Sequence, residues 1–239
     1  MAWIVVPIVL LGAGAMLYVG RCFNTTVGWH RNPWIAKNLR YQPLALIIGF
    51  VAVVATQLLV PEHANFMTIG VWDAPASGLG WLGVADGDSW RTVGVTFLVI
   101  MTLVTTMVIF FQVLRGSGVP TVALLKALTW ALGFSVTNAL AEELLFRVTV
   151  TEALAPVVSI TVVAATSAVL FGIPHWFGSP GRTPGVILAG FMGWFLAISV
   201  VQTAGIGWAF VIHWAQDVVI ITALIATADS AERRLRARP

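Results

Sequence analysis

Residues 141–147 read Ala-Glu-Glu-Leu-Leu-Phe-Arg and place two carboxylates and a guanidinium inside an otherwise apolar stretch. Ionisable groups within a membrane span are costly and are kept mainly where they face a polar cavity and have a function. Glu143 and Arg147 are four residues apart, so on a helix they share a face and can neutralise each other. Glu142 lies about 100° around the same helix from Glu143. Its carboxylate is therefore available to another partner.

Two further apolar segments carry ionisable residues. Phe171-x-x-x-His175 closes one block, and His213-x-x-x-Asp217 lies in the middle of the last. A glutamate with a nearby histidine can hold and deprotonate a water, the general-base arrangement for amide hydrolysis. A second histidine with a polar partner can donate hydrogen bonds to the resulting oxyanion. Glu, His and Asp are also zinc ligands, so these residues alone leave zinc as an alternative.

Each site has an ordinary structural reading: interfacial charges, an aromatic belt beside His175, or polar contacts that hold helices together. Their joint occurrence on three apolar segments favours convergence on one site.

The composition predicts an integral membrane protein. The 239 residues are 59% hydrophobic and 10% charged, and the mean hydropathy is +0.92. About 20 helical residues cross the hydrocarbon core, so blocks with few or no charges indicate spans. These blocks are 2–19, 43–60, 92–114, 121–140, 156–174 and a long one at 183–227, which 202–207 divides in two. We expect an all-α, polytopic transmembrane bundle of seven helices, or eight if 66–84 hides a re-entrant segment.

The chain is expected to form one membrane domain, 1–239. Its parts would be N-terminal helices and loops (1–115), a core of later helices with the three motifs (116–228) and a basic cytoplasmic tail (229–239). Lys and Arg gather in the first, third and fifth connections and the tail, whereas the second connection is acidic. Short basic loops stay cytoplasmic, which predicts the N-terminus outside and the C-terminus inside. The expected location is a bacterial plasma membrane.

Several functions are disfavoured. The net charge of +3 comes from loops and tail that would face anionic lipid headgroups. No basic stripe with interleaved aromatics is present, so nucleic acid is not an expected partner. The single Cys22 rules out an intrachain disulfide and a CxxC metal site. The absence of an inverted repeat or paired broken helices argues against a transporter.

The ordered motifs resemble those of the CPBP family, which comprises the CAAX proteases and the bacteriocin-processing or Abi enzymes. In this sequence they are Glu142-Glu143-x-x-x-Arg147, Phe171-x-x-x-His175 and His213-x-x-x-Asp217. The resemblance covers about 121–227 and leaves out the first two helices. It implies a glutamate-type intramembrane endopeptidase that needs no cofactor and acts on a membrane-associated peptide or protein among lipids. A non-enzymatic immunity, regulatory or scaffold protein of the same family is the alternative.

The resemblance also implies roles for individual residues. Glu142 and His175 would activate water, and His213 and Asp217 would stabilise the oxyanion. The remaining motif residues, Glu143, Arg147 and Phe171, would support them. Many members have Asn where this chain has Asp217, and an ionised Asp cannot donate a hydrogen bond. Either Asp217 orients His213, or the protonated acid donates.

A second departure and one geometric condition accompany the resemblance. Ser179 stands where some members carry Asn. A straight helix over 156–175 is about 28 Å long. His175 and Glu142 therefore reach a common level only if the Glu142 helix continues well past Arg147 or one segment breaks. Pro174 is the expected break.

Overall fold

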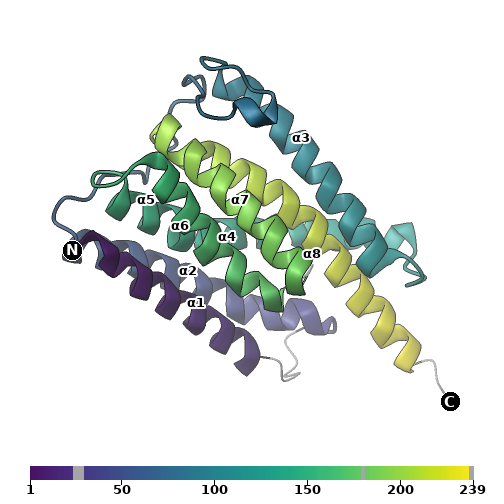
Figure 1. Ribbon diagram of the computed structural model, residues 1–239. Coiled ribbons are helices and arrows are strands. Elements are labelled where there is room, and N and C mark those ends of the chain that lie inside the picture. The colour runs from purple at the N-terminus through teal and green to yellow at the C-terminus, as the bar shows by residue number, and fades with distance from the viewer. Residues whose placement is uncertain (24–29, 179–180, 237–239) are drawn as a thin grey trace.

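The computed structural model describes residues 1–23, 30–178 and 181–236, and this part of the chain is helical, with no strand. Figure 1 shows the helices as a bundle whose two termini lie at opposite ends. The α-helices are α1 (Val5–Cys22), α2 (Pro33–Leu59), α3 (Trp90–Ile109), α4 (Thr121–Glu143), α5 (Thr149–Leu154), α6 (Ile160–Gly172), α7 (Arg182–Thr203) and α8 (Gly207–Arg236).

Short irregular turns extend several of these helices. A 3-10 turn (Ala2–Ile4) precedes α1, and a π-helical turn (Phe110–Leu114) follows α3. A second π-helical turn (Leu144–Val148) joins α4 to α5, so that Thr121–Leu154 is one continuous span. A 3-10 turn (Ile173–Phe177) ends α6.

Seven helices in the described ranges are long and apolar enough to cross a membrane. The prediction of an all-α, integral membrane protein is therefore confirmed. The eighth segment considered at 66–84 does not form, because that stretch is a loop with one 3-10 turn, Gly80–Leu82. Gly70, Gly78 and Gly83 adopt left-handed backbone conformations there, which a right-handed helix does not contain.

Helix α2 begins ten residues before the predicted boundary at 43. Asn32 caps it: its Oδ1 accepts hydrogen bonds from the backbone N–H groups of Trp34 and Ile35, at 2.9 and 3.2 Å. Pro33 occupies the first turn, where its fixed φ and missing N–H are tolerated. The Asn32 amide also donates to the Ile225 carbonyl of α8 at 2.9 Å. The cap thus fixes where α2 starts and ties it to α8.

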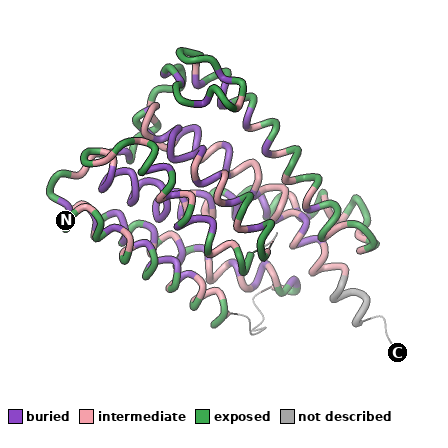
Figure 2. The backbone as a smooth tube through the Cα atoms, viewed as in Figure 1, coloured by how far each residue is buried: buried purple, intermediate pink, exposed green. Residues whose placement is uncertain are grey.

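Helix α4 packs against both α8 and α2. Figure 2 shows buried residues along the inner faces of the helices and exposed ones on the outer surface. Many exposed side chains are large and apolar, such as Leu11, Leu58 and Leu103, as expected for helices that face lipid. Gly49 brings α2 close to α4, since a Cβ there would lie 2.7 Å from the Ala141 carbonyl oxygen.

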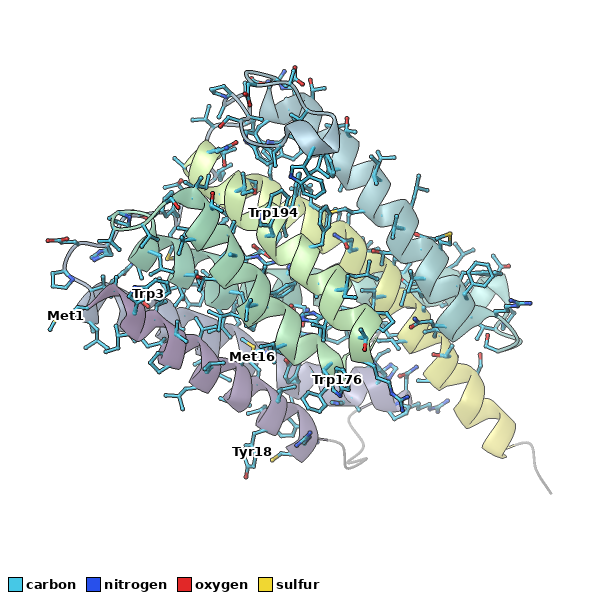
Figure 3. The ribbon with its side chains drawn as sticks, in the orientation of Figure 1. Met1, Trp3, Met16, Tyr18, Trp176 and Trp194 are labelled. Carbon is cyan, nitrogen blue, oxygen red and sulfur yellow. The ribbon has the colours of Figure 1, made fainter. Side chains whose placement is uncertain are left out.

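The two ends of the bundle differ in character. The second connection, 60–89, packs on the end of α5 and on the turn before α8, through hydrogen bonds such as Ala64 N–H to the Glu152 carbonyl. Figure 3 shows Trp3 near this end and Trp176 near the other. Helix α8 continues to Arg236, across the boundary at 229 that was expected between core and tail.

Candidate active site

The acidic motif lies where α4 changes to π-helical geometry. Glu143 is the last residue of α4, and the wider turn Leu144–Val148 follows directly. The Thr149 hydroxyl donates to the Leu144 carbonyl at 2.8 Å and stabilises this turn. Single π-helical turns occur frequently at functional sites. The helix that carries Glu142 thus continues past Arg147 to Leu154. This is one of the two conditions under which Glu142 and His175 can reach a common level in the membrane.

Glu143 and Arg147 form a fully buried ion pair, with 3.4 Å between Glu143 Oε2 and Arg147 Nε. The guanidinium also lies over the Phe171 ring, 3.8 Å from its centroid, in cation–π geometry. The second carboxylate oxygen of Glu143 lies 2.7 Å from His213 Nδ1. Both oxygens of Glu143 therefore have a partner, and neither side chain reaches a solvent-accessible space.

Glu142 has a different environment from its neighbour. Its Oε1 accepts a hydrogen bond from the Asn138 amide at 3.2 Å, and its Oε2 lies 3.5 Å from His213 Nε2. The Glu142 side chain is 17% exposed, whereas that of Glu143 is 0% exposed. Of the two acids, Glu142 is therefore the one that a water or substrate can reach.

His213 lies among three carboxylates. Its Nδ1 is hydrogen-bonded to Glu143, and its Nε2 lies near Glu142 and 3.7 Å from Asp217 Oδ2. A carboxylate accepts hydrogen bonds, so Nδ1 carries a proton. The nitrogen on the cavity side, Nε2, then accepts a hydrogen bond when the ring is neutral and donates one only when the ring carries both protons.

His175 has its ring orientation set by the backbone. It follows Pro174 within the 3-10 turn Ile173–Phe177, where the sequence predicts a break in the helix. Its Nδ1 lies 2.7 Å from the Phe171 carbonyl oxygen. A carbonyl only accepts, so Nδ1 donates and the neutral ring presents an unprotonated Nε2. The ring also packs on the Phe171 side chain, with 4.4 Å between centroids.

These groups meet at one cavity of about 420 Å³. Four predicted site residues line it: Glu142, His175, His213 and Asp217. The three predicted supporting residues, Glu143, Arg147 and Phe171, lie behind this lining and are buried. The structure thus brings all seven residues together, in two groups that correspond to the two predicted sets.

The sequence interpretation missed several polar residues of the site. Asn138 donates to both Glu142 and Asp217, at 3.2 and 3.0 Å. Its amide oxygen accepts from Gln42 of α2 at 3.3 Å, and Gln42 also donates to Asn38 at 3.2 Å. Asn138 lies four residues before Glu142, which is the signal that could have identified it. Gln42 and Asn38 lie outside the segment covered by the resemblance.

Two points raised by the sequence are the zinc alternative and the departure at Ser179. Across 1–23, 30–178 and 181–236, no three His, Cys, Asp or Glu side chains are arranged to hold one metal ion. Ser179, the second departure from the family pattern, lies outside the described residues. Glu142 and Asp217 each contact His213 and Asn138.

Residues 123–219, which contain all three motifs, match the family model described as Type II CAAX prenyl endopeptidase Rce1-like. No curated protein and no solved structure matches the chain. The matched segment begins in α4 and ends in α8, so it includes every predicted site residue and excludes α1–α3. Over this segment the chain is similar to the CAAX prenyl endopeptidases, which supports the resemblance to the CPBP family that the motifs indicate.

Proposed function

We propose that this protein is an intramembrane endopeptidase that hydrolyses a peptide bond in a membrane-associated peptide or protein. One observation carries the proposal: Glu142, a partly exposed carboxylate, and His175, whose Nε2 is available, line the same cavity among membrane-spanning helices. The match of residues 123–219 to a protease family model supports hydrolysis. The description of that family makes prenylated CAAX peptides the first substrates to test.

In the first step, a water held between Glu142 and His175 attacks the scissile carbonyl carbon. Glu142 takes one proton from the water as the new C–O bond forms, which is general-base catalysis. The Asn138 amide holds Glu142 Oε1 at 3.2 Å and leaves Oε2 on the side of His213. His175 can accept a hydrogen bond from this water at Nε2, because its Nδ1 donates to the Phe171 carbonyl.

In the second step, His213 stabilises the negative oxygen of the tetrahedral intermediate. It donates from Nε2, which requires the ring to carry both protons. The Asp217 carboxylate, 3.7 Å from Nε2, balances that charge while Glu142 holds the proton taken from water. Asp217 thus acts through its effect on His213, the first of the two roles considered for it. The C–N bond then breaks, and the proton taken from water passes to the leaving nitrogen.

The cavity would admit substrate from the basic end of the bundle. Its lining extends to Arg21 and Phe177 and to Lys37 near the start of α2. In the sequence these residues flank the first and fifth connections, where lysine and arginine gather. By the positive-inside rule this end faces the cytoplasm. We therefore propose cytoplasmic entry, with the N-terminus outside and the C-terminus inside.

Cleavage by the purified protein tests the proposal. Vesicles containing the protein are supplied with quenched fluorescent peptides: a farnesylated CAAX peptide, the same peptide without the lipid, and a membrane-spanning leader peptide. We expect cleavage of at least one peptide by the wild type and a loss of about 100-fold or more in E142Q and H175A, since base catalysis contributes about 10²–10⁴. E62Q, which changes an exposed glutamate of the second connection, is the control.

Two outcomes would contradict parts of the proposal. Cleavage that persists in both E142Q and H175A would disprove the assigned roles, and no cleavage of any peptide would favour a regulatory or scaffold protein. A chelator arm tests the expectation that no metal is needed. Activity lost with 1,10-phenanthroline and restored by zinc would replace this mechanism with a metal-dependent one.

A further inference from the structure

We propose that Asn138, oriented by Gln42 of α2, is a positioning residue that holds Glu142 and Asp217 at the distance the reaction requires. The inference rests on the proposed function and extends it to a helix outside the matched segment 123–219. It assigns α2 a role in the active site besides packing.

Asn138 joins the two cavity acids through a single amide. Its Nδ2 donates to Glu142 Oε1 at 3.2 Å and to Asp217 Oδ2 at 3.0 Å. An amide nitrogen has two protons, so both are used on carboxylates that belong to different helices. These two hydrogen bonds fix the spacing between α4 and α8 at the site and offset the repulsion between two negative groups.

A chain of amides on α2 determines which way the Asn138 side chain faces. The Asn38 amide nitrogen donates to the backbone carbonyl of Trp34 at 2.9 Å, so its oxygen faces Gln42. The Gln42 nitrogen then donates both protons, to the oxygens of Asn38 and Asn138, at 3.2 and 3.3 Å. This series of hydrogen bonds starts at a backbone carbonyl, which only accepts. Each amide in the series therefore has one favourable orientation.

The opposite orientation of Asn138 is strongly disfavoured. A flipped amide would point its oxygen at the carboxylates of Glu142 and Asp217 and its nitrogen at the Gln42 nitrogen. Gln42 and Asn38 are only 3% and 5% exposed, so water cannot easily replace the lost hydrogen bonds. Gln42, which also lines the cavity, therefore acts on Glu142 and Asp217 through Asn138.

Kinetics of single and double variants test this coupling. We expect Q42M and N138L each to lower kcat by about 10- to 100-fold with KM unchanged, since small displacements of catalytic groups cost up to about 10²-fold. In the N138L background, Q42M should have no further effect on kcat. Q57L is the matched control, because Gln57 is another amide of α2 that bonds to Glu152 and lies away from the cavity. Q42L provides the same test if Q42M does not fold.

Thermal unfolding separates the failure of this inference from that of the proposed function. If the hydrogen bond between Gln42 and Asn138 exists, the losses in Tm from Q42M and N138L sum to more than the loss in the double variant. The losses from Q57L and N138L should add. Additive losses for Q42M and N138L, or equal kcat effects of Q42M in both backgrounds, would overturn the inference. An inactive wild type would instead overturn the proposed function, and the positioning role with it, whatever the Tm values show.

Discussion

The buried pair of Glu143 and Arg147 gives a sharp test of how this bundle tolerates charge. Both side chains are 0% exposed, and 3.4 Å separates Oε2 of the glutamate from Nε of the arginine. Replacing Arg147 with methionine keeps an unbranched apolar side chain over the Phe171 ring but removes the positive charge. We expect R147M to be strongly destabilised, because Glu143 is left with a buried carboxylate whose cationic partner is gone.

The size of the effect follows from the environment of the pair. Removing one partner of a buried ion pair costs about 3–5 kcal/mol. For a chain of this size, about 2–4 °C of Tm corresponds to 1 kcal/mol, so we expect a fall of about 6–20 °C. His213 remains 2.7 Å from the other Glu143 oxygen and compensates part of the charge, which favours the lower half of that range.

The assay is thermal unfolding of detergent-solubilised protein, with wild type, R147M, E143Q and the double variant E143Q/R147M. Replacing both charges of a buried pair is often neutral, so the double variant should unfold at a higher temperature than R147M. The cation–π contact with Phe171, worth up to about 2 kcal/mol when desolvated, stays lost in it. K126M removes an exposed cation from the same helix and should change stability by less than about 0.5 kcal/mol. A Tm for R147M equal to that of K126M would refute this reasoning.

Three further predictions concern the elements that position the site. G49A should destabilise the protein by about 1–3 kcal/mol, because its Cβ would press on the α4 backbone at 2.7 Å. G133A, at an exposed glycine with open space around it, should be neutral or stabilising; equal Tm values for the two variants would contradict the close approach. E152A should speed cleavage of the second connection by proteinase K, since Glu152 Oε1 accepts from the Phe66 backbone N–H at 3.0 Å; an unchanged digestion pattern would count against this anchor. N32A should lower the free energy of unfolding by about 1 kcal/mol through loss of the α2 cap, and denaturant titration with no change in midpoint would exclude that contribution.

Much of the fold was predictable because span length and apolar composition are set by the bilayer. The helix boundaries were less predictable, because a rule based on charge ends each span at the first charged residues. Lys37 and Arg40 therefore excluded the first turns of α2, although long basic side chains can reach the membrane surface from within a helix. The same rule predicts that the span of α4 ends at residue 140. It continues to Leu154 because Glu143 and Arg147 compensate each other inside the bundle.

The site was predictable only in part, for a physical reason. Ionisable residues stand out in apolar sequence, so Glu142, His175 and His213 could be identified one by one. Neutral amides carry no such signal. Gln42 can be assigned to the site only through its hydrogen bond to Asn138, 96 positions away. That contact depends on how α2 crosses α4. Polar networks between distant helices need the tertiary structure.

The adjacency of the two acids explains why three motifs on three spans form one unit. Arg147 is always charged and gives Glu143 a fixed positive partner, so Glu143 accepts the hydrogen bond from His213 Nδ1 at 2.7 Å. That bond determines that Nε2 is the nitrogen facing Glu142 and Asp217. Glu143 therefore sets the tautomer and orientation of His213, while Glu142, one position earlier and about 100° around the helix, reaches the cavity. A change at Arg147 should consequently alter the behaviour of His213, although 66 positions separate them in the chain.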